Sequence, residues 1–239
     1  KATHLEPPDG KILFGPWYDR VTGDTIVDIT KRFNYKKFSF VQSDINITDH
    51  LQYPDEFIKH LDDSKADTIM YLTVYPFEGF DKVTDEAYDE FAQLIIKLVN
   101  AGRRVLIRYA SEMNGSWFNY GQKPKDFIAS YRKVVDLVRS GVPSELSEYY
   151  SFLWAPNSGN GYPFPNGLSS ITEDHPDFPM LDTNGDGELT IADDPYAPYY
   201  PGDDYVDWVG FSMYHYGAYW PWQQNVLPVS NQIKSLLFW

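Results

Sequence analysis

A single glutamate lies where an extended apolar run meets aromatic and amide side chains. In RYASEMNGSWFNYG, Arg108 to Gly121, Glu112 follows directly after the run RRVLIRYAS. A carboxylic acid at the end of a buried strand is suited to general acid/base catalysis, for example to protonation of a glycosidic oxygen. The alternative is a buried glutamate that pairs with Arg108 for structural reasons alone.

The neighbours of Glu112 are typical of a site that binds sugars. Trp117 and Tyr120 offer rings that stack on pyranose faces, and the amide of Asn114 can hydrogen-bond hydroxyl groups. We therefore predict that these three residues bind substrate. We expect Arg108 to point the same way as Glu112 and to orient or ionise a carboxylate.

Further aromatic residues are predicted to line the same cleft. Aromatic side chains make up 17% of the chain, which is more than a core of this size needs. Those expected at or just past strand ends, and assigned to substrate binding, are Trp17, His215, Trp220 and Trp222. The alternative is that such residues fill gaps in the core, which is the expectation for Trp154.

A second stretch has the spacing of a calcium loop. In DTNGDGELTIAD, Asp182 to Asp193, oxygen-bearing side chains alternate and a glycine stands at the sixth position. The predicted ligands of a structural Ca²⁺ ion are Asp182, Asn184, Asp186, the carbonyl of Glu188, and Asp193. The alternative is an acidic surface turn without metal.

Short apolar runs alternate with segments of helical period. The runs expected to form buried strands are Ile12–Asp19, Phe38–Ile45, Asp67–Tyr75, Arg103–Ser111, Tyr150–Pro156 and Asp204–Tyr214. Two clear helices are expected over Asp85–Gly102, with Thr84 as N-cap, and over Pro124–Gly141. This alternation predicts an α/β fold with parallel strands, either a doubly wound sheet or a (β/α)8 barrel.

The parity of one strand favours the barrel. In RRVLIRYASE, Val105, Ile107 and Tyr109 fall on one face of the expected strand. The other face turns polar towards its carboxyl end, with Leu106, Arg108, Ala110 and Glu112 in order. Active sites of (β/α)8 barrels lie at the carboxyl ends of the strands. No Gly-rich phosphate-binding turn follows the first strand, which disfavours a nucleotide-binding sheet.

The composition of the chain limits the classes of molecule that the protein is expected to bind. The 239 residues hold 34 acidic and 20 basic side chains, a net charge of -14 that disfavours nucleic acid and anionic membranes as partners. No apolar stretch is long enough to span a bilayer, and without cysteine neither disulfides nor thiolate zinc sites can form. Sequons occur at Asn46 and Asn114, and Asn46 is the predicted glycosylation site of a secreted, extracellular protein. Nothing in the sequence predicts an oligomeric state.

The motif around Glu112 resembles the acid/base strand of glycoside hydrolase family 26. The matching residues are Arg108, Glu112-Met113-Asn114-Gly115, Trp117-Phe118 and Gly121, and the stretches Leu153–Asn157 and Tyr199–Tyr214 resemble that family's fifth and sixth strands. The resemblance implies one catalytic-type (β/α)8 (TIM) barrel domain over residues 1–239, with about six βα units present and the calcium loop inserted at 182–193. It further implies a retaining β-glycosidase that cleaves cell-wall mannan or β-glucan, with Glu112 as acid/base and Tyr214 in contact with the nucleophile.

The sequence departs from the family pattern in two places. Ser111 stands where the family usually has histidine before the acid/base. The family's nucleophile is a glutamate on the seventh strand, and we expect strands seven and eight to lie outside these 239 residues. The rival interpretation is therefore a non-catalytic extracellular protein that keeps the barrel for glycan binding and lacks the nucleophile.

Overall fold

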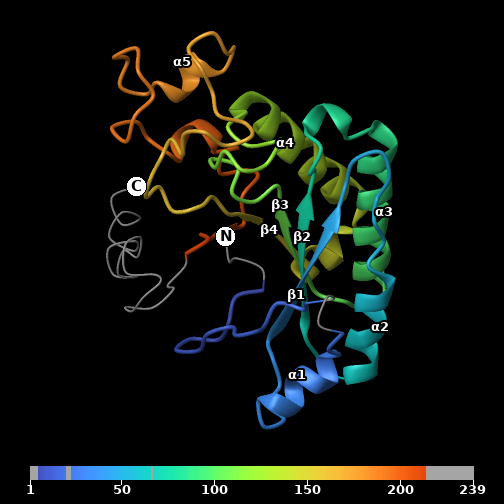
Figure 1. Cartoon of the computed structure of the whole chain (residues 1–239). Helices are drawn as coiled ribbons and strands as arrows, with labels where there is room; N and C mark the ends of the chain where they lie inside the picture. Colours follow the sequence, from blue (N-terminus) through green and yellow to red (C-terminus); the bar gives the residue numbers. More distant parts are fainter. Residues whose placement is uncertain (1–4, 20–22, 66, 214–239) are drawn as a thin grey trace.

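The strands form one parallel sheet whose order follows the sequence. The computed structural model describes residues 5–19, 23–65 and 67–213. Its sheet has the order β1-β2-β3-β4-β5 (Figure 1). The strands are β1 (Phe40–Asn46), β2 (Ile69–Tyr75), β3 (Val105–Tyr109), β4 (Tyr150–Trp154) and β5 (Trp208–Val209). A doubly wound sheet reverses its strand order at a switch point, and this sheet does not, so the order is that of part of a (β/α)8 barrel.

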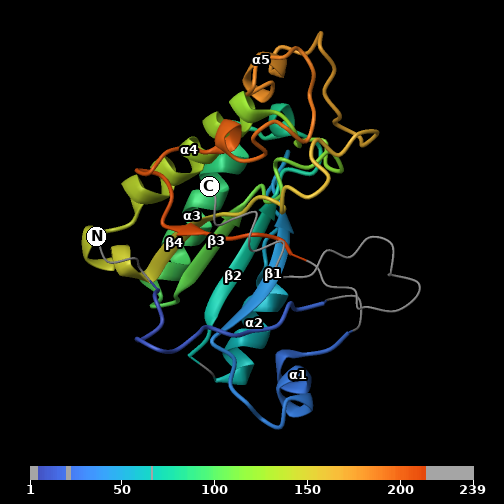
Figure 2. The ribbon, with the colours of Figure 1, turned by 90° about the vertical axis from the view of Figure 1, so that its left-hand side faces the viewer.

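The long helices cover one face of the sheet. Figures 1 and 2 show α2, α3 and α4 on the same side of the strands, with the other face open to the viewer in Figure 2. The helices are α1 (Ile26–Arg32), α2 (Asp55–Ser64), α3 (Asp85–Asn100), α4 (Pro124–Gly141) and α5 (Phe178–Leu181). Short 3₁₀ turns are η1 (Phe80–Lys82), η2 (Ser144–Tyr149) and η3 (Ala197–Tyr199). None of the described helices combines the length and the apolar character that a membrane crossing requires.

Both predicted helices are confirmed, with the expected ends. The Thr84 side chain accepts a hydrogen bond from the backbone N–H of Ala87 at the start of α3. Just after the helix, Gly102 has φ +80°, a left-handed conformation that costs glycine little. In α4, Pro124 is the first helical residue, where its missing N–H costs no hydrogen bond.

The two faces of the sheet bury different residues, as parity predicts. The side covered by helices forms the main core, to which β3 contributes Val105, Ile107 and Tyr109, all 0% exposed. On the open side a smaller cluster joins Leu106 to Ile69, Leu153 and Ala155, with Phe40, Tyr71 and Trp208 packed against it. Trp154 fills the core as expected, and its indole N–H donates to the carbonyl of Tyr199.

Two expected strands are shorter than predicted. The segment Ile12–Asp19 forms only an isolated parallel bridge, Trp17 to Gln42 of β1, because Pro16 has no N–H for a regular ladder. Of Asp204–Tyr214, only Trp208 and Val209 form a strand, followed by a bridge from Asn157 to Ser212. Tyr214 lies outside the described residues.

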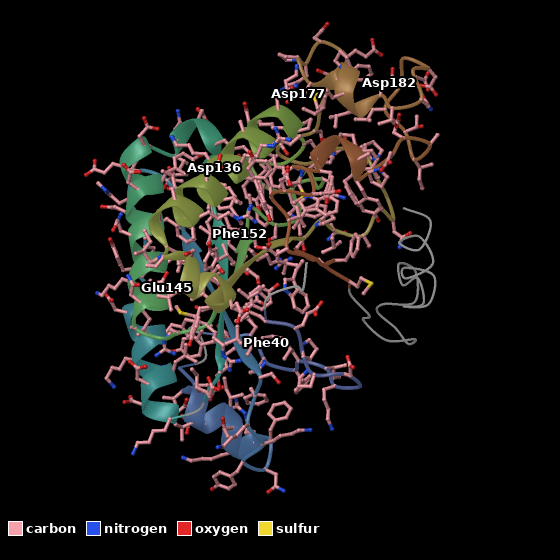
Figure 3. All side chains as sticks on the ribbon, turned by 180° about the vertical axis from the view of Figure 1, so that it is seen from behind. Phe40, Asp136, Glu145, Phe152, Asp177 and Asp182 are labelled. Carbon is pink, nitrogen blue, oxygen red and sulfur yellow. The ribbon has the colours of Figure 1, made fainter. Side chains whose placement is uncertain are left out.

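A long connection joins β4 to β5 at the carboxyl ends of the strands. It carries α5, the acidic stretch 182–193 and η3, and it lies above the arrowheads in both views (Figures 1 and 2). In Figure 3, Asp177 and Asp182 on this connection lie well above Phe40 and Phe152 of the sheet. The acidic stretch therefore lies apart from the body of the sheet.

One buried hydroxyl cluster offers a test of the packing between α3, α4 and β3. The hydroxyl of Ser130 lies 2.6 Å from those of both Tyr88 and Tyr109, whereas the hydroxyl of Tyr131, one residue further, is buried without a hydrogen-bond partner. We predict that Ser130→Ala lowers the free energy of unfolding by about 1 to 3 kcal/mol, because it removes a partner from two buried groups. Tyr131→Phe removes no hydrogen bond and should be neutral or stabilising. Urea unfolding of the two variants checks this, and equal destabilisation of both would contradict it.

Candidate active site

Polar side chains gather towards the carboxyl ends of the strands on the open face. The register pairs Asp44 with Thr73 and Thr73 with Arg108, so these three form one row across β1, β2 and β3. The next pair on this face towards the carboxyl ends is Asn46 and Tyr75. Rows nearer the amino ends are mainly apolar, with Phe40, Ile69, Tyr71 and Leu106. The open face therefore becomes polar only where a barrel would have its active site.

The chain turns sharply where β3 ends. Ala110 and Glu112 have φ of 45° and 59°, the left-handed region that non-glycine residues seldom adopt. The Ala110 N–H still donates to Val74 of β2 at 2.8 Å, but the Glu112 N–H donates to the carbonyl of Ala155, after β4, at 2.8 Å. The parity count that placed Glu112 beside Arg108 therefore holds only as far as Tyr109, and the turn positions Glu112.

The Glu112 carboxylate is held by an indole. Trp117 Nε1 donates to Glu112 Oε2 at 2.8 Å. Glu112 is largely buried, with an exposed fraction of 9%. The Trp117 ring meets Phe164 edge-on, with centroids 5.0 Å apart. Gly115 makes this possible, because a Cβ there would lie 2.3 Å from the indole. The hydrogen bond from Trp117 to Glu112 thus requires a residue without a side chain at position 115.

Arg108 does not form the structural ion pair that was the alternative for Glu112. Its Nη2 donates to Ser212 Oγ at 2.6 Å. In the described ranges, no ion pair joins Arg108 to Glu112. Arg108 also lines a pocket of about 300 Å³ on the open face, together with Gln42, Tyr71, Leu153, Ala155 and the segment 210–213.

Tyr75 belongs to the site although the sequence did not single it out. Burial raises the pKa of its hydroxyl, Arg108 opposes that shift, and the carboxylates of Glu112 and Asp44 add to it. The phenol therefore stays protonated and remains a hydrogen-bond donor near both carboxylates. Parity of β1 and β2 beyond the apolar positions is the signal that would have found Tyr75, and Asp44 with it.

Two predicted sugar-binding residues lie inside the protein. Asn114 is 0% exposed, and its side chain exchanges two hydrogen bonds of 2.9 Å with the backbone of Asn157. Tyr120 is 0% exposed, stacks on Phe118 and donates to the carbonyl of Ser111 at 2.6 Å. In this structure both residues stabilise the loop that carries Glu112, and neither presents a surface to a sugar.

The remaining predicted residues have different positions. Trp117 is half-buried beside Glu112, and Trp17 is 54% exposed beside β1. Tyr214, His215, Trp220 and Trp222 lie outside the described residues. The predicted glycosylation site, Asn46, is the last residue of β1, and its side-chain oxygen is buried without a hydrogen-bond partner. Its glycosylation stays a prediction.

Hydrogen bonds within the acidic loop occupy two of the predicted calcium ligands. Asp182 accepts from the N–H groups of Gly185, Asp186 and Gly187, and Asp193 accepts from those of Thr183, Asn184 and Thr190. Gly187 has φ +86°, as the turn at the sixth position requires. Across residues 5–19, 23–65 and 67–213, no group of three His, Cys, Asp or Glu side chains is arranged to hold a metal ion. Calcium binding therefore stays a prediction.

Comparisons with known proteins show the fold. No protein-family model and no curated protein matches the sequence. Among solved structures, GH26A from Muricauda sp. MAR_2010_75 is similar with a TM-score of 0.55 at 19% identity, over 96% of this chain and 73% of that one. The GH26 domain of PbGH26-GH5A endo-β-mannanase/endo-β-glucanase from Prevotella bryantii has a TM-score of 0.53 at 17% identity, over 85% and 67%.

A third similar structure is the catalytic domain of the GH26 endo-β-1,4-mannanase of Bacillus sp. JAMB-750. Its TM-score is 0.53 at 16% identity, over 95% of this chain and 62% of that one. The chain thus has the α/β fold of GH26 domains and corresponds to part of their (β/α)8 barrel. The expected fold class is confirmed.

We predict that Gly115→Ala separates Trp117 from Glu112. The added methyl group would overlap the indole, so the ring must move and the hydrogen bond from Nε1 is lost. The indole N–H resonance of Trp117, assigned with Trp117→Phe, should shift in the variant. An unchanged resonance would contradict this account. Gly102→Ala is the control for general destabilisation: its φ of +80° strains an alanine, but its Cβ would meet no atom within 4 Å, so the Trp117 resonance should not shift.

The calcium prediction has its own test. Titration calorimetry with millimolar Ca²⁺ should show binding at one site, and Ca²⁺ should raise the unfolding temperature relative to a sample with chelator. Asp186→Asn should weaken binding and disturb the loop little, because Asp186 is exposed and accepts hydrogen bonds only within the loop, from the Glu188 N–H and the Asn184 side-chain amide. If Ca²⁺ gives no heat of binding and does not raise the unfolding temperature, the stretch is an acidic turn without metal.

Proposed function

We propose that this protein is a retaining glycoside hydrolase that cleaves β-linked cell-wall polysaccharide, mannan or β-glucan, with Glu112 as the acid/base. The observation that carries the proposal is the largely buried carboxylate of Glu112, fixed by the Trp117 indole at the carboxyl end of β3. The similar structures support the substrate class, since two of them are named as β-mannanases and one of these also as a β-glucanase.

Several of the described residues contribute to proton transfer in the proposed mechanism. Glu112 donates its proton to the glycosidic oxygen as the bond to the anomeric carbon breaks, and later takes a proton from the water that releases the sugar. The hydrogen bond from the Trp117 N–H to one oxygen of Glu112 fixes the orientation of the carboxyl group for this transfer. Arg108 and Tyr75 supply positive charge and a donor nearby. We assign no nucleophile among the described residues.

Binding without hydrolysis is the second candidate function. The same open face, with its pocket and aromatic side chains, would serve a protein that holds glycans without cleaving them. Activity of the wild-type protein on soluble mannan and mixed-linkage β-glucan separates the two, because a binding protein retains affinity and releases no reducing ends. For either function we propose that the protein acts outside the cell, where such polymers occur.

Glu112→Gln tests the proposed role. The amide cannot donate a carboxylic proton but has nearly the same shape, so we expect hydrolysis to fall by at least about a hundredfold while affinity for oligosaccharides is retained. Reducing-end release and calorimetry measure the two quantities. The matched control is Glu145→Gln, a carboxylate in η2 remote from the open face. Wild-type turnover by Glu112→Gln would exclude the acid/base role.

A chemical rescue separates an acid/base from a structural carboxylate. In Glu112→Ala, an aryl glycoside with an acidic phenol as leaving group needs no protonation, and azide can replace water in the second step. We expect azide to restore turnover and to yield a glycosyl azide of retained configuration. A variant that azide does not rescue, although it is folded, would contradict the retaining mechanism.

A further inference from the structure

A wall of aromatic rings extends outward from the end of β2. Tyr75 and Phe77 stack with centroids 4.6 Å apart and an interplanar angle of 14°. Phe118 packs against both rings, at centroid distances of 5.5 and 5.9 Å, and it stacks on the buried Tyr120. The loops after β2 and β3 therefore build this wall together.

Phe77 is the outermost ring of the wall. Its exposed fraction is 39%, whereas Tyr75 and Phe118 are half-buried. One face of the Phe77 ring lies on Tyr75, and within the part of the chain that the structure describes, Tyr75 and Phe118 are the rings that contact it. The opposite face of Phe77 is therefore open to an apolar surface of a ligand.

Hydrogen bonds fix the position of Phe77. The Asn119 side chain donates from Nδ2 to the Phe77 carbonyl at 3.0 Å. The Gly79 N–H donates to the carbonyl of Pro76 at 2.9 Å, which closes a turn around Phe77. Gly79 has φ +114°, a backbone conformation that suits glycine. Because the ring is already ordered, little entropy is lost when a ligand binds to it.

The Asn119 amide offers a ligand a polar partner next to this ring. Asn119 is exposed, and its bond to Phe77 uses one N–H of an amide that has two N–H donors and a carbonyl oxygen. No described residue forms a second hydrogen bond with this side chain. The other N–H and the oxygen can therefore bond hydroxyl groups of a ligand.

The wall adjoins the loop that carries Glu112. Asn119 stands two residues after Trp117, whose indole donates to the Glu112 carboxylate. Burial raises the pKa of the Tyr75 hydroxyl, and the Glu112 carboxylate adds to this shift, so the carboxylate lies near the inner end of the wall. A polysaccharide chain bound at Glu112 can therefore extend along the wall to Phe77.

The chemistry of the ring and the amide selects a neutral sugar. A pyranose has an apolar C–H face for the Phe77 ring and hydroxyl groups at its rim for the Asn119 amide. A lipid chain would leave the amide without a partner. The exposed carboxylate of Glu78 and the net charge of -14 would repel a phosphorylated or uronate-bearing ligand.

We propose that Phe77 and Asn119 form a second sugar-binding subsite, beside the site at Glu112, that takes one neutral hexopyranose unit of the same polysaccharide chain. The unit stacks on the outer face of the Phe77 ring and hydrogen-bonds the Asn119 amide. This inference rests on the proposed function, because it assumes that a glycan occupies the open face next to Glu112.

Oligosaccharide binding to variants of the two residues tests the subsite. Calorimetry uses the Glu112→Gln protein, which does not consume its ligand, with hexasaccharides of β-linked mannose and of β-linked glucose. We expect Phe77→Ala to weaken binding by about tenfold and Asn119→Ala by at least about threefold. Phe77→Tyr keeps the ring and should retain the affinity. Phe77→Leu keeps an apolar side chain without a ring and should lose most of it.

A spectroscopic measurement reports contact with the ring itself. Protein labelled with fluorinated phenylalanine has a fluorine resonance of Phe77 that is missing from Phe77→Leu. Saturating hexasaccharide should shift this resonance. The resonance of Phe91, a fully buried residue of α3 assigned in the same way, should stay unchanged. A Phe77 resonance that does not shift when the ligand is bound would contradict stacking.

The control removes an exposed aromatic ring elsewhere. Tyr35 is 70% exposed after α1, and its φ of 59° suits asparagine, so Tyr35→Asn should leave the affinity unchanged. If the Glu112→Gln protein binds a hexasaccharide and Phe77→Ala in the same background binds it equally well, the subsite is overturned and the proposed function stands. If the Glu112→Gln protein binds none of the oligosaccharides, the proposed function falls and the subsite falls with it.

Discussion

The hydrogen bond from the Glu112 N–H to the carbonyl of Ala155 is the interaction on which the site depends. It ties the chain after β3 to the end of β4, while the preceding bond from Ala110 still belongs to β2. The turn that links them holds two non-glycine residues in left-handed backbone conformations, a cost that the surrounding contacts must offset. Without this bond the backbone would continue in the direction of β3, and the Glu112 carboxylate would not meet the Trp117 indole.

Much of the framework follows from the sequence because local patterns dictate it. Helical period and capping place α3 and α4, with Thr84 and Gly102 at the ends of α3. Alternation along β3 separates Ile107 from Arg108 correctly, since one face packs on helices and the other is open. The motif from Glu112 to Trp117 was identified by its resemblance to a family pattern, and the structure gives the glycine a reason, since a Cβ at Gly115 would overlap the Trp117 indole.

Other parts could not be predicted because they depend on contacts between distant segments. The burial of Asn114 and Tyr120 follows from partners that are set only when the loops after β3 and β4 meet. The row of Asp44, Thr73 and Arg108 requires the register of three strands, which no single run specifies. The expected strand before β1 forms only one bridge, because Pro16 has no N–H to donate to the β1 ladder.

The pairing of Asn114 with Asn157 also bears on how the protein can be produced. Asn114 begins the sequon Asn-Gly-Ser, and its third residue, Ser116, donates to the carbonyl of Phe164. A glycan attached to the Asn114 amide before folding would occupy the nitrogen that donates to Asn157, at a position that is fully buried. A host that glycosylates nascent chains would therefore divert part of its product into molecules that cannot close this loop, whereas a host without that machinery would not.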